Sequence, residues 1–409
     1  MIVAYYRNVL AILAVATYCT GWSMYQSLVY PALGQPKDWI LGLSLLSIPL
    51  WLDKPTFRQH FLKVPLVVWC FGFVWVAMLW FLWSSQSEIA WRDVRLRLSA
   101  IMLVLSCLMI FASPSAVRSA RWAIVFAVLF GVALNIYEFF VPLTFSQVLG
   151  RSAGFYLNPN LSGEALVFGM ILCVTVLPSY FRGPFLLLAG LGIFLTLSRG
   201  AIVAWFIAVS GLIFFAKGVR AKDLVWTVLL SLLVVGIVLL PKLDAILAAM
   251  DQAHVVTKDT EQRFAWLTDP FGASDNSALQ RQYLAEQAWA KFSEHPWIGS
   301  GTGTFHESFD LPPHNQYLSY MLDHGIVGAA IMPLLILALI WGARGETRRV
   351  GLVFGATTLW LSFWTHTMLS FGHSLLLFAL LAAMASTESF RVREAAKATA
   401  AGETAFAKA

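Results

Sequence analysis

His314 is the residue of this sequence best placed to accept a proton, because it stands where a polar segment meets an apolar one. Two prolines before it favour an extended backbone, and an apolar run begins a few residues later. Steps of four, three, four and three residues lead from His314 through Leu318 and Met321 to Gly325 and Gly328. We expect all five on one helical face. The pattern indicates a base above a narrow groove, and it is equally typical of an interfacial histidine beside helix-packing glycines.

Two arginines stand at turns where a fixed positive charge meets the edge of the apolar segments. Arg199 is the centre of Ser198-Arg199-Gly200, a connection so short that the guanidinium must stay near the membrane edge. Arg151 opens a turn-rich segment that runs to Asn160. A guanidinium is a planar, permanently charged fork suited to phosphate. These positions therefore favour a substrate that carries phosphate.

Arg281 lies in the polar segment, on a helix that we expect over residues 277–294. Four apolar residues share its face: Leu284, Ala285, Ala288 and Phe292. A lone charge on a buried face is costly unless it meets an anion. The sequence leaves two partners open, a structural carboxylate such as Asp310 or the phosphate of a ligand.

The composition indicates a membrane protein. The chain has 409 residues, 59% of them hydrophobic and only 12% charged, and runs long enough to cross a bilayer as helices recur along it. We therefore predict an all-α polytopic membrane protein with about twelve transmembrane helices. The predicted spans are residues 8–28, 37–52, 64–83, 98–113, 119–137, 161–178, 184–198, 200–216, 223–241, 314–342, 349–369 and 373–388.

The spans define the expected organisation of the chain. Residues 1–241 hold helices one to nine, 242–313 a long periplasmic loop with short helices, 314–388 helices ten to twelve, and 389–409 a cytoplasmic tail. The distribution of Lys and Arg favours cytoplasmic termini. Arg92, Arg95 and Arg97 run against that trend at an outer edge. We expect Arg92 and Arg95 to reach lipid phosphates, and the role of Arg97 stays open.

These parts support a transfer reaction at the aqueous face of a membrane. The sequence has no Cys/His metal cluster, no Walker loop and no Asp-x-Asp pair, so we expect neither a metal nor a cofactor, although composition alone leaves a Ser/His/Asp triad open. A diphosphate leaving group needs charge neutralisation, which arginines supply. Histidine, with an ordinary pKa of about 6.5, is suited to take a hydroxyl proton.

The motifs resemble those of the bacterial O-antigen ligase family (WaaL type), within a group that includes Wzy-type O-antigen polymerases and protein O-oligosaccharyltransferases. His314-Asn315, nine residues and then Gly325-x-x-Gly328 agrees with the ligase signature. The supporting matches are Gly154-Phe155-Tyr156 through Asn158-Pro159-Asn160, Ser198-Arg199-Gly200, and Arg281 ahead of His295-Pro296 and Gly299-x-Gly301.

The resemblance implies a metal-independent, inverting glycosyltransferase at the periplasmic face of the bacterial inner membrane. It would move polysaccharide from undecaprenyl diphosphate to the outer core sugar of lipid A-core, among membrane lipids and without nucleic acid. It makes His314 the general base and Arg199 and Arg281 diphosphate ligands, with Arg151 as a further one. The supporting positions, without an assigned contact to sugar, are Asn315, Tyr317, Asn160, Gly325 and Gly328.

A transporter or flippase of lipid-linked glycans is the alternative from a different class of protein. It would share the twelve spans and the arginines within or near them. Against it, ionisable residues near span centres are few, and the two halves show no convincing repeat. Glu138, Glu164 and His366 are the first residues to inspect for a proton relay.

Overall fold

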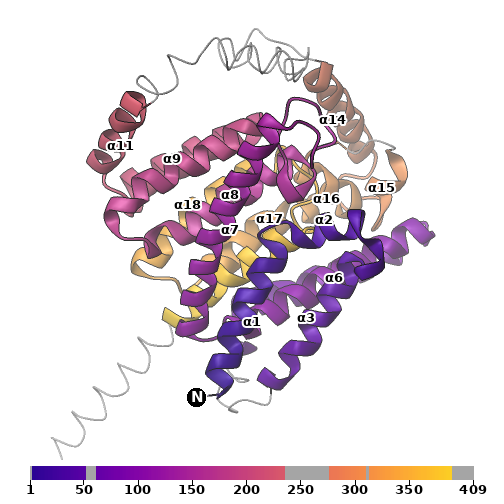
Figure 1. Cartoon of the computed structure of the whole chain (residues 1–409). Coiled ribbons are helices and arrows are strands. Elements are labelled where there is room, and N and C mark those ends of the chain that lie inside the picture. Colours follow the sequence, from indigo (N-terminus) through magenta and orange to yellow (C-terminus); the bar gives the residue numbers. More distant parts are fainter. Residues whose placement is uncertain (1, 52–60, 235–275, 310–312, 389–409) are drawn as a thin grey trace, which may run out of the picture.

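The computed structural model describes residues 2–51, 61–234, 276–309 and 313–388, and every regular element in these ranges is helical (Figure 1). This confirms the predicted all-α class. Residues 242–275 of the predicted loop, Asp310 and the predicted tail over 389–409 lie outside the described residues.

The N-terminal part of the bundle begins with a broken helix, in which Ile2–Tyr18 is followed by Trp22–Val29. The sequence explains the starts of several helices, because Ser87 and Ser113 cap α6 and α7 with side-chain hydrogen bonds and Pro65 opens α5. The elements are α1 (Ile2–Tyr18), α2 (Trp22–Val29), η1 (Pro31–Leu33), α3 (Pro36–Trp51), α5 (Pro65–Phe81), α6 (Glu88–Ile110) and α7 (Pro114–Phe140).

The rest of the described chain completes the bundle around α8, in which every residue except Asn160 is buried. Helix α8 packs against α7, α9, α10 and α18. The elements are η2 (Gly154–Tyr156), α8 (Pro159–Cys173), η3 (Val174–Val176), α9 (Ser179–Leu195), α10 (Arg199–Ser210), η4 (Gly211–Phe215), α11 (Ala221–Val234), α14 (Asn276–Glu294), α15 (Thr304–Ser308), α16 (Gln316–His324), α17 (Ile326–Ile340), α18 (Gly345–Leu361) and a final helix, Gly372–Glu388.

Few single helices of the described chain are long enough to cross a membrane. Pro114–Phe140 and Pro159–Val176 are each long and apolar enough, and α1 with α2 makes a third span if the pair, bent by 56°, crosses as one. The prediction of twelve spans therefore stays a prediction. The shorter apolar helices, of 10–17 residues, are Pro65–Phe81, Ser179–Leu195, Arg199–Phe215, Ile326–Ile340 and Gly372–Glu388.

The predicted single span over 314–342 is wrong, because Gly325 divides it into α16 and α17. Gly325 has φ 61° and ψ −148°, a conformation that ends α16 at His324. A Cβ at Gly325 would lie 2.4 Å from the carbonyl oxygen of Trp297, and one at Gly328 would lie 1.9 Å from that of Tyr320. The two glycines therefore allow close backbone packing after a sharp turn. They do not continue one helical face from His314, because Gly325 follows the end of α16 and Gly328 belongs to α17.

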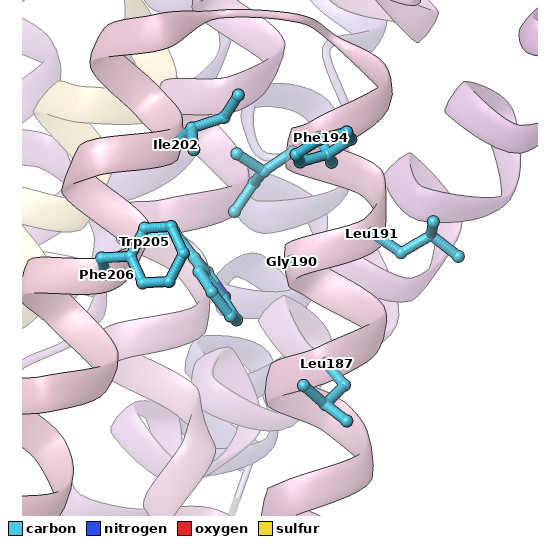
Figure 2. Close-up of a pocket in the computed structure, with 8 residues that line it drawn as sticks. Leu187, Gly190, Leu191, Phe194, Ile202, Trp205 and Phe206 are labelled. Atoms are coloured by element: carbon cyan, nitrogen blue, oxygen red, sulfur yellow. The ribbon is translucent and has the colours of Figure 1, made fainter. Parts of the chain in front are cut away.

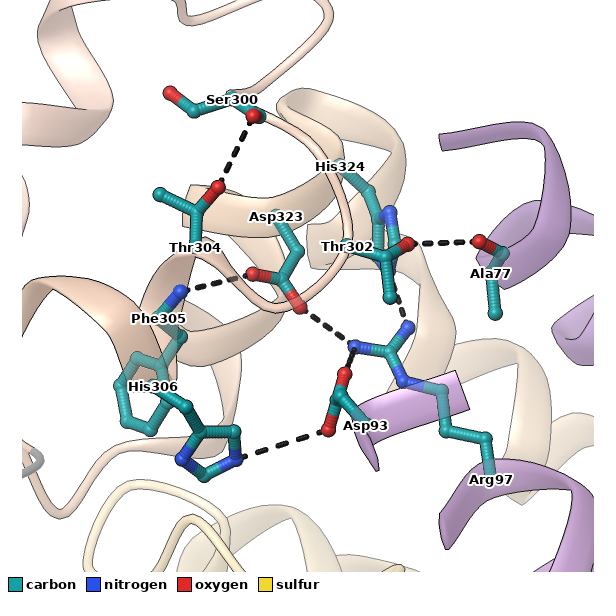
Figure 3. Close-up of polar contacts among 10 residues, drawn as sticks. All are labelled: Ala77, Asp93, Arg97, Ser300, Thr302, Thr304, Phe305, His306, Asp323 and His324. Carbon is teal, nitrogen blue, oxygen red and sulfur yellow. Dashed lines mark hydrogen bonds and ion pairs between the residues drawn. The ribbon is translucent and has the colours of Figure 1, made fainter. Parts of the chain in front are cut away.

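Helix α16 is fixed to α6 by a buried ionic cluster (Figure 3). The Arg97 guanidinium lies 2.7 Å from a carboxylate oxygen of Asp93 and 2.6 Å from one of Asp323. Asp323 also accepts a hydrogen bond of 3.1 Å from the backbone N–H of Phe305, and Arg97 contacts the ring of His324. Arg97, whose role the sequence leaves open, thus joins α6, α15 and α16.

Replacing Arg97 by Met is expected to lower the free energy of unfolding by about 3–5 kcal/mol, because two buried carboxylates lose their counter-charge. Thermal unfolding of the purified protein in detergent measures the effect. Arg95→Met is the matched control on the same helix, since Arg95 is half exposed and pairs with Glu88 at the surface. Equal unfolding midpoints for the two variants would show that the cluster contributes nothing to stability.

Candidate functional site

One pocket collects side chains from four separate parts of the chain. The starts of α8 and α10, Arg281 of α14 and the connection after α18 meet around it. In Figure 1, α14 lies at the upper end of the bundle, away from the first residues of α1. The pocket's polar and aromatic side chains are those of Asn160, Glu164, Ser198, Arg199, Arg281, Trp364 and Thr365.

Arg281 reaches this pocket because α14 packs on α16. Ala288 and Phe292 of α14 join Leu318 and Leu322 of α16 in one small core. This contact confirms the predicted apolar stripe at those positions and sets Arg281 at the end of α14 nearest the pocket. Its charge also acts on His314. The alternative carboxylate partner, Asp310, lies outside the described residues.

Arg199 is the first residue of α10, and its backbone is fixed by close packing. The indole N–H of Trp360 donates a hydrogen bond of 3.2 Å to the carbonyl oxygen of Gly200. A Cβ at Gly163 of α8 would lie 2.6 Å from that of Ala201, so the two helices almost touch. The N-terminal end of a helix attracts anions, which adds to the charge of Arg199. This end of the pocket is therefore suited to a phosphate.

Arg151 holds in place residues that surround the pocket. It is buried, and its Nε donates a hydrogen bond of 2.9 Å to the carbonyl oxygen of Thr196, in the turn before Arg199. Its Nη2 donates one of 3.0 Å to the Oδ1 of Asn160. These bonds orient Asn160 and the turn that carries Arg199. They favour a positioning role for Arg151 over the predicted direct contact with diphosphate.

Glu138, which the sequence offered as a relay residue, is a structural anchor. Its buried carboxylate accepts hydrogen bonds from the backbone N–H groups of Phe145, at 2.7 Å, Ala153, at 2.7 Å, and Gly154, at 2.9 Å. A further bond comes from the N–H of Ser146. Four backbone donors on one carboxylate hold the connection between α7 and α8 in place.

Asn315 and Tyr317 hold the start of α16, immediately after His314. Asn315 caps the helix, because its Oδ1 accepts a hydrogen bond of 3.1 Å from the N–H of Leu318. The hydroxyl of Tyr317 donates to the carbonyl oxygen of Leu359 at 3.3 Å. Both predicted support residues therefore have structural contacts of their own.

Gln316 completes this attachment. Its N–H donates to the carbonyl oxygen of Ser362 at 2.8 Å, and its side-chain oxygen accepts from the N–H of Met368 at 3.1 Å. The start of α16 is therefore tied to the same connection after α18 that lines the pocket.

His366 is a site neighbour that the sequence offered only as a relay for transport. Its ring centroid lies 5.1 Å from that of His314, and its buried Nδ1 has no hydrogen-bond partner. His366 follows Thr365, which lines the pocket. Because 52 positions separate the two histidines, no local pattern connects them.

The surroundings keep both imidazoles neutral. Although His314 retains an exposed edge, partial burial and then the charge of Arg281 lower its pKa to about 4. Burial, followed by the neighbouring His314 and His306, lowers the pKa of His366 to about 3. A neutral imidazole near the Arg281 guanidinium has a lone pair that can accept a proton near pH 7.

A bundle of apolar helices with a cationic pocket and a neutral histidine at one end defines a multi-pass membrane protein with a candidate enzyme site. Residues 184–333 match the family model of O-antigen ligase. Over these residues the chain is similar to O-antigen ligases. The match includes Arg199, Arg281 and His314, and it leaves Arg151 and Asn160 outside. No curated protein matches the chain significantly.

Diethyl pyrocarbonate, which modifies neutral imidazole, is expected to react with His314 with half-maximal rate near pH 4. In Arg281→Gln the midpoint should rise, because a positive neighbour is lost, but stay below the ordinary value of about 6.5, because burial remains. Mass spectrometry of the modified peptide measures each midpoint. Lys291→Gln, on the same helix, is the control and should leave the midpoint unchanged. A wild-type midpoint at the ordinary value would contradict the described environment.

Proposed function

We propose that this protein is an O-antigen ligase, which transfers polysaccharide from undecaprenyl diphosphate to the outer core sugar of lipid A-core at the periplasmic face of the inner membrane. The observation that carries the proposal is the position of Arg281. Its guanidinium lines the pocket with Arg199 and also acts on His314. The family match supports the reaction class, and the position of Arg281 supports the roles proposed below.

The two arginines bind the donor's diphosphate through forked, charge-assisted hydrogen bonds. The acceptor hydroxyl oxygen attacks the anomeric carbon of the donor sugar, on the face opposite to the diphosphate. One carbon–oxygen bond forms, and the bond between the anomeric carbon and the diphosphate oxygen breaks, so the configuration inverts. Undecaprenyl diphosphate leaves with the bonding electrons, and Arg199 and Arg281 stabilise the charge that develops on it.

His314 takes the proton of the attacking hydroxyl, and donor binding makes it a stronger base. In the empty site, Arg281 contributes to the low pKa of His314. A bound diphosphate neutralises that guanidinium and brings further negative charge, which favours the protonated imidazole. The pKa of His314 therefore rises when the donor is present. His314 is therefore most basic when a donor sugar is bound and the acceptor hydroxyl can attack it.

The closest alternatives share this donor and differ in the acceptor. A Wzy-type polymerase would extend another lipid-linked glycan, and a protein O-oligosaccharyltransferase would modify a protein hydroxyl. A transporter is not favoured, because Glu138 is occupied by backbone donors and Glu164 accepts a hydrogen bond of 2.7 Å from Ser374. The assay below therefore offers several acceptors to one donor.

The purified protein, given lipid-linked donor, lipid A-core and a chelator, is expected to attach glycan to lipid A-core. His314→Gln should lower turnover by about 10²–10⁴-fold, because a positioned base contributes that much, while donor affinity stays near normal. His295→Gln, at an exposed histidine, is the control and should behave as wild type.

Gel analysis of the products separates the alternatives. Transfer to a second lipid-linked glycan or to a protein in place of lipid A-core would assign the chain to a polymerase or an oligosaccharyltransferase. Near-normal turnover in His314→Gln would remove the proposed base.

Arg199→Lys is expected to lower kcat/KM by about 10–100-fold, because lysine keeps the charge but loses the fork that bonds two phosphate oxygens. Steady-state kinetics with varied donor measure the change. Arg220→Lys, at an exposed position before α11, is the control and should leave kcat/KM unchanged. Wild-type kinetics in Arg199→Lys would show that a point charge is sufficient.

A further inference from the structure

The pocket of the candidate site contains a carboxylate that the proposed chemistry does not use. Glu164 of α8 lines the same pocket as Arg199 and Arg281, and its side chain is almost completely buried. A carboxylate repels phosphate, and the repulsion is strong where water is scarce. Glu164 therefore does not help to bind a diphosphate, and its presence among the lining residues needs another explanation.

The hydrogen bonds and ion pairs of Glu164 use only one of its two carboxylate oxygens. Oε1 accepts a hydrogen bond of 2.7 Å from the hydroxyl of Ser374 and lies 3.5 Å from Nε2 of His373. Both partners are buried at the start of the final helix, so they fix the orientation of the carboxylate. Within the described part of the chain, no group donates to Oε2. Because each carboxylate oxygen is an acceptor, Oε2 can accept a hydrogen bond from a ligand in the pocket.

Asn160 provides a hydrogen-bond donor beside this acceptor. It precedes Glu164 by one turn of α8, so the two side chains share a helical face, and both line the pocket. Arg151 donates to the amide oxygen of Asn160, which leaves its NH₂ group as a donor, and no described residue accepts from that group. A hydroxyl-rich ligand can bond both side chains, since a hydroxyl donates and accepts. The diphosphate of a lipid-linked donor offers acceptors alone and cannot bond Glu164.

Trp364 adds an aromatic surface to the same lining. It is 45% exposed and follows α18. Small-molecule sites combine aromatic surface with a few placed polar groups that fix the orientation of the ligand. A sugar ring, with C–H groups on its faces and hydroxyls at its edge, matches this combination.

A second hollow on α10 lacks such groups. It lies between α9 and α10, and its lining side chains are apolar or aromatic (Figure 2). The indole N–H of Trp205 is already used, because it donates to the carbonyl oxygen of Leu186 at 3.1 Å. A sugar bound there would leave its hydroxyls unpaired, which is costly. Of these two hollows, the pocket of the candidate site is the one suited to a sugar.

We propose that Glu164 and Asn160 bind the first sugar of the donor, the one bonded to the diphosphate. The proposal rests on the proposed function, which places the diphosphate at Arg199 and Arg281. A hydroxyl or amide N–H of the sugar donates to Oε2 of Glu164, and the NH₂ group of Asn160 donates to a sugar oxygen. Repulsion by Glu164 keeps the phosphates at the arginines. The two side chains of α8 thus orient the donor and make its first sugar part of recognition.

Binding of the lipid-linked donor and of bare undecaprenyl diphosphate to the protein in nanodiscs tests the sugar contact. Wild type should bind the donor about tenfold more tightly. Glu164→Gln keeps the side chain's size and should weaken donor binding about tenfold, because a charge-assisted hydrogen bond is lost. The same variant should bind the bare diphosphate as tightly as wild type or more tightly, because a repulsive charge is removed. Glu286→Gln, at an exposed glutamate of α14 outside the pocket lining, is the control and should bind both ligands as wild type.

The two ligands separate sugar recognition from a structural role of Glu164. If Glu164 served only to hold the final helix, Glu164→Gln would weaken both ligands alike, and that result would overturn the sugar contact. Equal affinity of wild type for the two ligands would also overturn it, without recourse to a variant. Both results leave the proposed function standing, since the diphosphate still binds. Wild type that binds neither ligand would overturn the proposed function and the sugar contact with it.

Discussion

A guanidinium buried between two carboxylates fixes the helix that follows His314. Arg97 of α6 pairs with Asp93 and, across the bundle, with Asp323 near the end of α16. In a region of low dielectric, neither sign of charge is tolerable alone, so the two helices must stay together. Gln316 holds the other end of α16 to the connection after α18. With both ends attached, the start of α16, which follows His314, is held against the connection that lines the pocket.

A second set of contacts fixes the position of Arg199. Glu138 accepts hydrogen bonds from the backbone between α7 and α8. Arg151, in the same segment, donates hydrogen bonds to Thr196 and Asn160. The pocket is therefore supported from two directions, by carboxylates and guanidinium groups that do not line it. Such supports matter because a transfer site must hold its charged groups in place before the substrate arrives.

In the proposed reaction, Arg281 links donor binding to the basicity of His314. Without donor, its charge helps to hold the pKa of His314 near 4. With a diphosphate bound, the same guanidinium is neutralised and the imidazole becomes more basic. In the proposed reaction, His314 is therefore a weak base until the donor is bound.

The hydrophobic periodicity of the sequence was sufficient to predict features that depend only on residues close together in the chain. The stripe of α14 that carries Ala288 and Phe292 follows from helical spacing, and its packing on α16 follows from burial. Periodicity did not predict the helix break at Gly325, because the hydrophobic pattern of the sequence continues through this residue of positive φ. The pairing of Arg97 with Asp323 and the contact of His314 with His366 join distant segments. Only the packing of the whole bundle brings such residues together.

The most direct measurement is an electron cryomicroscopy structure of the protein with undecaprenyl diphosphate bound. The account predicts diphosphate density that contacts the guanidinium groups of both Arg199 and Arg281, with the imidazole of His314 at the side from which an acceptor approaches. Diphosphate bound away from both arginines, or at the opposite end of the bundle, would contradict it.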